Sequence, residues 1–140
     1  MASNHRWSSA SARKLDSCET PLQEIMNSVL AHFPFDVVII EGHRSNARQQ
    51  QLFDAGKSKA LPGQSKHNRF PSEAVDAAPL VDGKIQWNNR DLWIQFASFV
   101  KAIGASQGYD IRWGGDWDGD LNIEEHSFLD FPHFEYRGKL

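Results

Sequence analysis

The sequence has 140 residues, a net charge of −3 and a pI near 6.0. Its 40% hydrophobic and 24% charged residues are typical of a soluble globular protein, and the slightly acidic balance argues against a nucleic-acid partner. The single cysteine, Cys18, excludes an intrachain disulfide. No apolar run approaches the ~18 residues of a membrane span, so we expect no stable membrane association. We also expect a monomer.

The N-terminal residues 1–13 are polar and rich in Ser and Ala. They contain no apolar segment of the signal-peptide type, so we expect synthesis in the cytoplasm and delivery elsewhere by another route. The composition predicts a flexible arm over residues 1–13, which Trp7 could tether to the core. A single domain is expected over residues 14–140.

Three helices are predicted from hydrophobic spacing and from capping residues. Thr20 is expected as the N-cap of the first, with Pro21 at the first helical position and Gln23 completing a capping box. Apolar residues recur at helical spacing as far as residue 33. Two further helices are expected at residues 45–55 and 89–107.

Four short apolar or β-branched segments are predicted as strands, at residues 35–40, 74–78, 109–113 and 131–136. The second is expected to end at Pro79, because proline lacks the N–H that a ladder needs. Asp82-Gly83 indicates a turn, and the segments at 57–72 and 114–122 are expected as loops. Helices and strands alternate without a repeat, which favours one α+β domain.

Two polar segments contain the residue types of a metal hydrolase. One runs from Ser65 to Asp76 and includes His67, and the other reads Asp130-Phe131-Pro132-His133-Phe134-Glu135. A zinc hydrolase needs three protein ligands, an open position for water and a carboxylate to take the proton of that water. Two histidines and one aspartate would leave a net positive charge on the ion and keep it a strong Lewis acid.

These segments resemble the S-x-H…A-x-D and D/E-x-x-H signatures of the zinc D-Ala-D-Ala carboxypeptidase and dipeptidase superfamily. Gly42-His43-Arg44-Ser45 is similar to the Gly-x-Arg-Ser element of the L-alanyl-D-glutamate peptidases used as bacteriophage endolysins. The likeness extends from about Pro21 to Tyr136. It implies a small antiparallel sheet with packed helices, and zinc-dependent cleavage of L-alanyl-D-glutamate in the peptidoglycan stem during host cell lysis.

Two alternatives to that activity stay open. One is a D-Ala-D-Ala carboxypeptidase, which would cut another bond of the same stem. The other is a non-catalytic, metal-holding module that binds the cell wall on the same scaffold.

The resemblance also implies a role for individual residues. The zinc ligands would be His67, Asp76 and His133, with Asp130 as general base and Arg44 as the residue that contacts substrate and stabilises oxyanion charge. Ser65 is expected to contact the substrate or support a ligand, and Glu135 to orient His67 or His133. The spacing from His67 to Asp76 is nine residues instead of the commoner seven, which a longer loop accommodates at little entropic cost.

An acidic pattern in the last loop suggests a second cation. Oxygen-bearing side chains occur at every second position among glycines, at Asp116, Asp118, Asp120 and Asn122. Calcium takes six to eight oxygen ligands, so the pattern supports a calcium-site hypothesis. The alternative is a solvated acidic turn.

Overall fold

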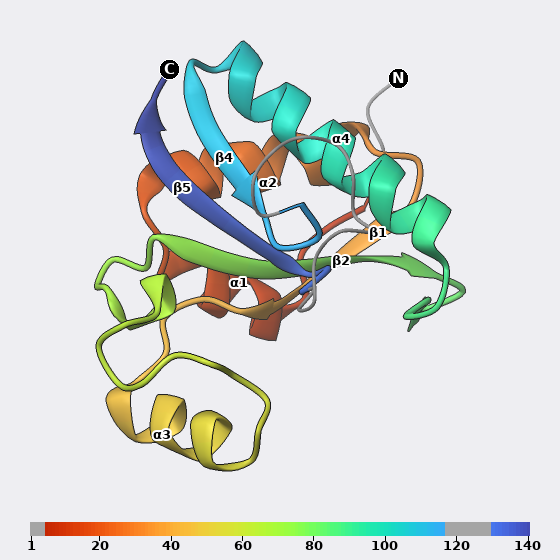
Figure 1. Ribbon diagram of the computed structural model, residues 1–140. Coiled ribbons are helices and arrows are strands. Elements are labelled where there is room, and N and C mark those ends of the chain that lie inside the picture. Colours follow the sequence, from red (N-terminus) through yellow and green to blue (C-terminus); the bar gives the residue numbers. More distant parts are fainter. Residues whose placement is uncertain (1–4, 117–129) are drawn as a thin grey trace.

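The computed structural model describes residues 5–116 and 130–140. Its described strands form one antiparallel sheet in the order β1-β2-β5-β4, with β3 paired to the far end of β2 (Figure 1). The strands are β1 (Asp36–Glu41), β2 (Ala74–Val81), β3 (Lys84–Ile85), β4 (Tyr109–Trp113) and β5 (His133–Lys139). The helices are α1 (Ser9–Asp16), α2 (Thr20–His32), α3 (Asn46–Asp54) and α4 (Arg90–Ser106), with a 3₁₀ turn η1 (Lys66–Asn68). The predicted α+β class and the antiparallel sheet are confirmed.

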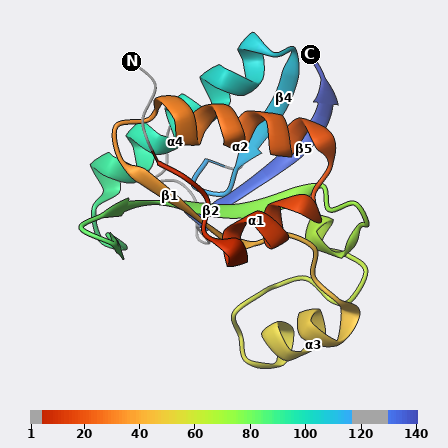
Figure 2. The same ribbon diagram turned by 180° about the vertical axis from the view of Figure 1, so that it is seen from behind.

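The hydrophobic core lies between the sheet and the helix pair α2/α4, which Figure 2 shows from the helix side. Phe96 of α4 joins the layers, because its ring meets Phe33 at 5.3 Å and Phe134 of β5 at 5.8 Å, both edge to face. Burying one such side chain stabilises the fold by ~1.5–3 kcal/mol. Of the described helices, none is long and apolar enough to cross a membrane.

Side chains of a strand alternate between the two faces of a sheet, and this alternation separates the core from the chemistry. In β5, Phe134 enters the core, whereas His133 and Glu135 lie on the opposite face, called here the site face. In β2, Val75 pairs with Phe134, and Asp76 pairs with His133. The core face therefore anchors the strands that hold the polar residues of the site face.

The first helix, α1, contains residues 9–13 of the predicted flexible arm over residues 1–13, and residues 1–4 of that arm lie outside the described part of the chain. Ser8 caps α1, and Ser11 is buried where its hydroxyl accepts the backbone N–H of Ile39 in β1. This hydrogen bond gives an acceptor to a backbone N–H of β1 at the edge of the sheet. It involves no apolar stripe, so hydrophobic periodicity could not detect the helix. The predicted tether is confirmed, since Trp7 Nε1 donates to Asn27 Oδ1 at 2.7 Å.

The start of α2 also differs from the prediction. Its N-cap is Glu19, and Thr20 already belongs to the helix. The N–H of Glu19 donates to the carbonyl of Ser72, which holds Glu19 extended one residue earlier than expected. Gln23 closes no capping box, because its amide donates to the carbonyl of Cys18. The helix starts expected at residues 45 and 89 are confirmed, since Ser45 is the N-cap of α3 and Asn89 that of α4.

Strand β2 runs past Pro79 to Val81, three residues beyond the predicted end. Among the described strands, β5 pairs only with residues 74–76 of β2, so the absent N–H of Pro79 interrupts no ladder on that side. The expected turn at Asp82-Gly83 is confirmed, with φ of 52° and 76° as a two-residue hairpin turn requires. The predicted loop at 57–72 contains the unpredicted η1.

Candidate metal centre

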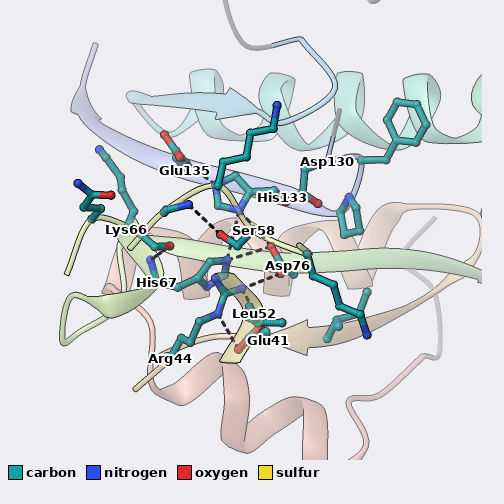
Figure 3. A pocket seen from close by; sticks show the side chains of 18 of the residues that line it. Glu41, Arg44, Leu52, Ser58, Lys66, His67, Asp76, Asp130, His133 and Glu135 are labelled. Atoms are coloured by element: carbon teal, nitrogen blue, oxygen red, sulfur yellow. Dashed lines mark hydrogen bonds and ion pairs between the residues drawn. The ribbon is translucent and has the colours of Figure 1, made fainter. Parts of the chain in front are cut away.

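Three side chains of the ligand type converge on the site face (Figure 3), and we call them the His/Asp/His group: His67, Asp76 and His133. His67 Nε2 lies 3.0 Å from Asp76 Oδ1, and His133 Nδ1 lies 3.2 Å from the same oxygen. The two ring nitrogens are 3.2 Å apart. All three residues are at most 9% exposed. Within residues 5–116 and 130–140, this is the one cluster that could hold a metal ion.

The spacing of the three atoms fits a tetrahedral ion. With ligand bonds of about 2.0–2.1 Å, zinc separates neighbouring ligand atoms by about 3.3–3.4 Å. The observed edges of 3.0 and 3.2 Å are close to that separation, so one point lies within bonding distance of all three atoms.

The hydrogen bonds on the far side of each imidazole fix which nitrogen carries the lone pair. His67 Nδ1 lies 2.7 Å from the carbonyl oxygen of Gly42, which can only accept, so Nδ1 bears the proton. His133 Nε2 lies 2.9 Å from Glu135 Oε1 and donates to it. In the neutral rings, two lone pairs and the Asp76 carboxylate therefore face one another, an arrangement that a cation stabilises.

The electrostatics of the group also favour a positive charge. Burial raises the pKa of Asp76, but attraction to His67 and the hydrogen bonds with His133 and His67 outweigh it and hold that pKa well below its usual range. Burial opposes protonation of His133, yet its hydrogen bonds to Asp76 and Glu135 raise its pKa to about 9. A bound metal ion would supply positive charge at the same place instead of that proton.

Two members of the group come from the sheet and one from the loop. Asp76 and His133 are direct cross-strand partners, as expected for an antiparallel pair on one face. His67 lies in η1, where Ser65 accepts the N–H of His67 at 3.2 Å and Asn68 closes a capping box. Ser65 therefore holds the backbone of His67 in place, and its expected role towards a ligand or the substrate stays a prediction.

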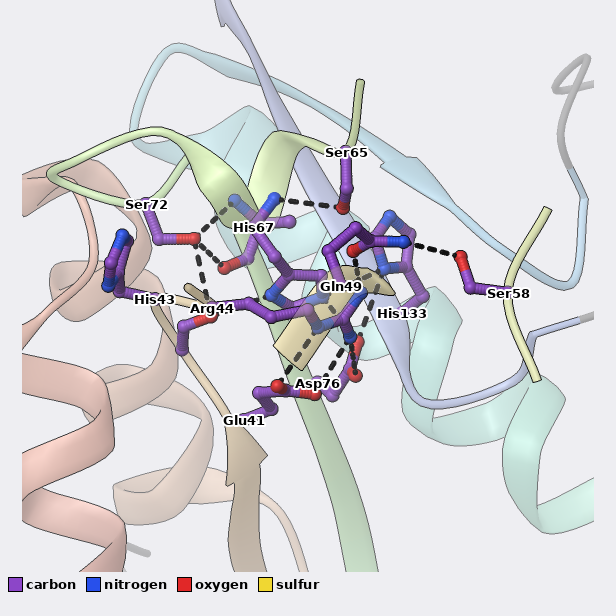
Figure 4. A network of polar contacts seen from close by, with 12 residues as sticks. Glu41, His43, Arg44, Gln49, Ser58, Ser65, His67, Ser72, Asp76 and His133 are labelled. Atoms are coloured by element: carbon purple, nitrogen blue, oxygen red, sulfur yellow. Dashed lines mark hydrogen bonds and ion pairs between the residues drawn. The ribbon is translucent and has the colours of Figure 1, made fainter. Parts of the chain in front are cut away.

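Arg44 is buried within a polar network beside the group (Figure 4). Its guanidinium makes a two-bond fork with Glu41, at 2.9 and 2.7 Å, and donates to Gln49 Oε1 at 2.8 Å. The nearest oxygen of Asp76 is Oδ2, at 3.7 Å. Arg44 thus neutralises the oxygen of Asp76 that points away from the two histidines.

Sequence reasoning missed Glu41 and Gln49. A bulge in β1 explains Glu41: Ile39 pairs with Ala77, but Glu41 pairs with Asp76 instead of Val75. The extra residue moves the Glu41 side chain from the core face to the site face. Gln49 is fully buried and links Arg44 to Ser58 Oγ and the carbonyl of Ala60. The one feature that could have pointed to Gln49 is its inward-facing position in the helix, five residues after Arg44.

Glu135 orients His133 rather than His67. Its Oε1 accepts from His133, and its Oε2 receives Arg112 Nε at 3.1 Å and Nη2 at 3.0 Å. Arg112 and Glu135 are cross-strand partners on β4 and β5. Burial raises the pKa of Glu135, but the contact with His133 outweighs it and lowers the pKa overall, so the carboxylate stays charged.

Asp130 lies in the turn that enters β5, as expected, and lines the same cleft as the His/Asp/His group. Its carbonyl accepts the N–H of His133, and its own N–H donates to Gly114. A Cβ on Gly114 would lie 2.3 Å from the Asp130 carbonyl oxygen, so this close approach needs glycine. Burial and repulsion by Asp76 raise the pKa of Asp130, as suits a carboxylate that accepts a proton.

The cleft around these residues has a volume of about 970 Å³. Its lining includes three basic residues from the segment that precedes β2, Lys57, Lys59 and Lys66. It also includes the apolar residues Trp87, Phe131 and Pro132. The cleft is large enough for a short peptide segment extended across the His/Asp/His group.

The calcium hypothesis rests largely on residues outside the described ones. Asp118, Asp120 and Asn122 lie in the segment 117–129, which the structure does not describe. Asp116 is buried and forms a β-bridge with Trp113. The calcium site stays a prediction.

The fold and the site define a class, that of the peptidases built on the D-Ala-D-Ala peptidase fold. Two solved structures under 25% identical share this fold. The vancomycin-resistance D,D-dipeptidase VanXYg has a TM-score of 0.52 at 17% identity, covering 96% of this chain and 52% of that one. The D,D-pentapeptidase VanY in complex with Zn(II) has a TM-score of 0.51 at 16% identity, covering 99% and 76%.

A family model described as phage L-alanyl-D-glutamate peptidase matches residues 3–136, and the chain belongs to that family. The L-alanyl-D-glutamate peptidase of Escherichia phage T5 is 31% identical over 116 residues, covering 81% of this chain and 84% of that protein. The peptidoglycan L-alanyl-D-glutamate endopeptidase CwlK of Bacillus subtilis is 29% identical, covering 94% and 83%. The Serratia marcescens L-Ala D-Glu endopeptidase ChiX superposes with a TM-score of 0.74 at 27% identity, covering 94% and 89%.

Proposed function

We propose that this protein is a zinc-dependent peptidase that cleaves the L-alanyl-D-glutamate bond of the peptidoglycan stem, as an endolysin in host cell lysis. The observation that carries the proposal is the convergence of three lone pairs, from His67, Asp76 and His133, within one cleft beside Asp130. The family and its relatives supply the bond and the substrate class. The protein would be made in the cytoplasm and reach the wall after release across the membrane.

In this proposal His67, Asp76 and His133 hold the zinc ion. When bound there, zinc supplies Lewis acidity and lowers the pKa of a water molecule to ~7. Glu135 keeps the imidazole of His133 in the tautomer whose Nδ1 faces the site. Arg44 Nη2 lies 3.7 Å from Asp76 Oδ2 and would keep this second oxygen turned away from the ion.

Asp130 moves the proton in the hydrolysis. It accepts a proton from the attacking water as the new carbon–oxygen bond forms at the alanyl carbonyl. It then donates this proton to the nitrogen of D-glutamate as the carbon–nitrogen bond breaks, which regenerates the carboxylate. Arg44 lines the cleft and stabilises the negative charge that develops on the carbonyl oxygen. The rigid fork with Glu41 keeps that guanidinium in place without reorganisation.

The test compares the protein with its Asp130→Asn variant on purified peptidoglycan. The variant keeps the ligand group, so we expect unchanged zinc content and a kcat lower by ~10²–10⁴-fold. Mass spectrometry of the products should show new N-terminal D-glutamate. Release of free D-alanine, with a stem shortened by one residue, would instead indicate the D-Ala-D-Ala carboxypeptidase, and zinc binding without any cleavage would indicate the non-catalytic module.

A further inference from the structure

An exposed tryptophan lines the cleft. Trp87 is 54% exposed, although most large apolar side chains of the described residues are at least partly buried. It belongs to the connection between β3 and α4, and lines the cleft together with Phe131 and Asp130. An aromatic side chain left in contact with water beside a catalytic cleft is a candidate for ligand contact.

The position of Trp87 is fixed by the buried aromatic side chains behind it. Trp93 of α4 is 1% exposed, and its ring lies 5.8 Å from that of Trp87 with an interplanar angle of 34°. Trp93 Nε1 donates to the carbonyl oxygen of Trp87 at 3.3 Å, and its ring stacks on Phe131 at 5.9 Å. Trp87 is therefore supported on one side by Trp93 and shares an aromatic stack with the residue that follows Asp130.

A second, shallower hollow of about 590 Å³ continues from Trp87 along the same connection. Its lining adds polar amides to the indole ring, at Gln86, Asn88 and Asn89. Asn89 is committed to the N-cap of α4, where its Oδ1 accepts the N–H of Leu92. Asn88 is exposed, and the contacts of the Gln86 amide with the described residues are long, at 3.5 and 3.4 Å from backbone carbonyls. A flat aromatic face next to amide donors and acceptors suits a sugar, whose ring offers both C–H groups and an N-acetyl or hydroxyl group.

The proposed substrate places a sugar within reach of this hollow. In peptidoglycan, the L-alanine of the stem is joined through its amino group to the lactyl group of a muramic acid unit. Only one amino acid separates the scissile carbonyl from that sugar, so the ring lies within about 10 Å of the reacting carbon at ~3.3–3.6 Å per unit of chain. A peptidase that cuts this bond in the intact wall must therefore accommodate the glycan beside its cleft.

The charges along the cleft indicate the orientation of the substrate. The D-glutamyl residue bears a free carboxylate, which matches Lys66, a cleft residue of η1 that lies beside Glu73 just before the start of β2. The connection with Trp87 follows the hairpin at the other end of β2 (Figure 1). The uncharged sugar then falls at the end of the cleft where Trp87 lies.

Resting on the proposed function, we propose that Trp87, with the amides of Gln86 and Asn88, forms a subsite for the muramic acid unit of the glycan strand. Trp87 stacks on the sugar ring, and the amides bind its polar substituents. The enzyme thereby distinguishes a stem peptide attached to glycan from a free stem peptide of the same sequence.

The kinetic test uses two soluble substrates with the same stem peptide, one attached to N-acetylmuramic acid and one with an acetyl group in its place. We expect Trp87→Ala to lower kcat/KM on the muramoyl substrate by ~10-fold, mainly through KM, as the loss of one aromatic contact implies. The loss on the acetyl substrate should be much smaller, and Trp87→Phe should retain most of the preference. Phe35→Ala is the matched control, because Phe35 is also an exposed aromatic, at 37%, and lines neither hollow.

Equal losses on both substrates would mean that Trp87 only supports the fold, and no loss on either would mean that it makes no contact. Both results overturn the subsite. If the parent protein cleaves neither substrate, the proposed function fails, and the subsite is then decided by binding alone. For that purpose, peptide-free glycan fragments are titrated into the zinc-loaded protein while the indole N–H signal of Trp87 is followed by NMR. A shift that Asn88→Ala weakens supports the subsite, and no shift up to ~10 mM, an affinity too weak to matter, excludes it.

Discussion

The sheet and the loop before it hold their parts of the His/Asp/His group by different means. Asp76 and His133 are opposite residues on paired strands, and the core residues Val75 and Phe134 between β2 and β5 set that register. His67 belongs to a 3₁₀ turn held by single hydrogen bonds: its ring donates to the Gly42 carbonyl, its backbone N–H donates to Ser65, and its carbonyl accepts the N–H of Arg44. Each such bond contributes ~1 kcal/mol. A slip of the sheet register would move every core side chain of the strand, so the sheet holds Asp76 and His133 firmly. Small changes should therefore displace His67 in the loop more easily than the two residues of the sheet.

The largest effect is expected when a proposed ligand is removed from either region. His67→Ala in the loop and His133→Ala in the sheet should each lose zinc. Their activity should fall by more than the ~10²–10⁴-fold expected for a missing general base. Elemental analysis and peptidoglycan turnover measure the two quantities. A double variant that still binds one zinc per chain would contradict the ligand assignment.

A second prediction concerns the backbone that supports the loop ligand. A Cβ on Gly42 would lie 2.1 Å from the carbonyl oxygen of Lys14 and 2.5 Å from Ser17 Oγ. Gly42→Ala must therefore shift the backbone just after β1, whose carbonyl accepts the N–H of the His67 ring. We expect a loss of ~1–3 kcal/mol in the free energy of unfolding, together with weaker zinc binding. Denaturant unfolding and zinc titration measure these effects.

The control for that variant is Gly104→Ala in α4. A Cβ there would meet only side chains and a backbone oxygen of the core, at 3.0 Å from Ile111 and further from Ile25 and Tyr109. It should lower stability without changing zinc affinity. If both variants leave zinc affinity unchanged, the carbonyl of Gly42 is not important for the loop ligand.

A third prediction weakens the sheet side through the partner of His133. Glu135→Gln keeps an acceptor for His133 Nε2 but removes the negative charge, so zinc affinity should fall towards the lower end of ~10–100-fold. Competition with a chelator measures the affinity. Glu73→Gln is the matched control, because Glu73 pairs with Lys66 and Arg69 at the partly exposed start of β2. Equal effects in the two variants would indicate a general loss of negative charge.

The smallest expected effect compares two serine caps. Ser65 accepts the N–H of His67 at 3.2 Å, and Ser45 accepts the N–H of Arg48 at 3.1 Å. Ser65→Ala and Ser45→Ala should each destabilise the protein by ~1 kcal/mol. Only Ser65→Ala should weaken zinc binding, by a few-fold, because only that cap holds a ligand. A similar loss of zinc affinity in Ser45→Ala would show that the loop responds as a whole.

The sequence was most informative where a motif or a local rule applies. The turn at Asp82-Gly83 and the helix starts at residues 45 and 89 follow from local sequence preferences, and all are found. The two signature segments brought together His67, Asp76 and His133, which the structure places within 4.8 Å of one another. The errors fall where a tertiary contact overrides a local preference. Glu19 caps α2 because Ser72 binds its backbone, and α1 is stabilised by the edge of β1.

The sequence alone determined the α+β class, the residues of the His/Asp/His group and the family, because these depend on residue type and order along the chain. Only the tertiary structure decided how the group is held. The bulge at Ile40 moves Glu41 onto the site face, and buried Gln49 binds Arg44 from another element. It also showed that Trp87 remains exposed beside the cleft while Trp93 is buried behind it. Strand register, bulges and burial arise from the packing of distant segments, and no local pattern along the chain specifies them.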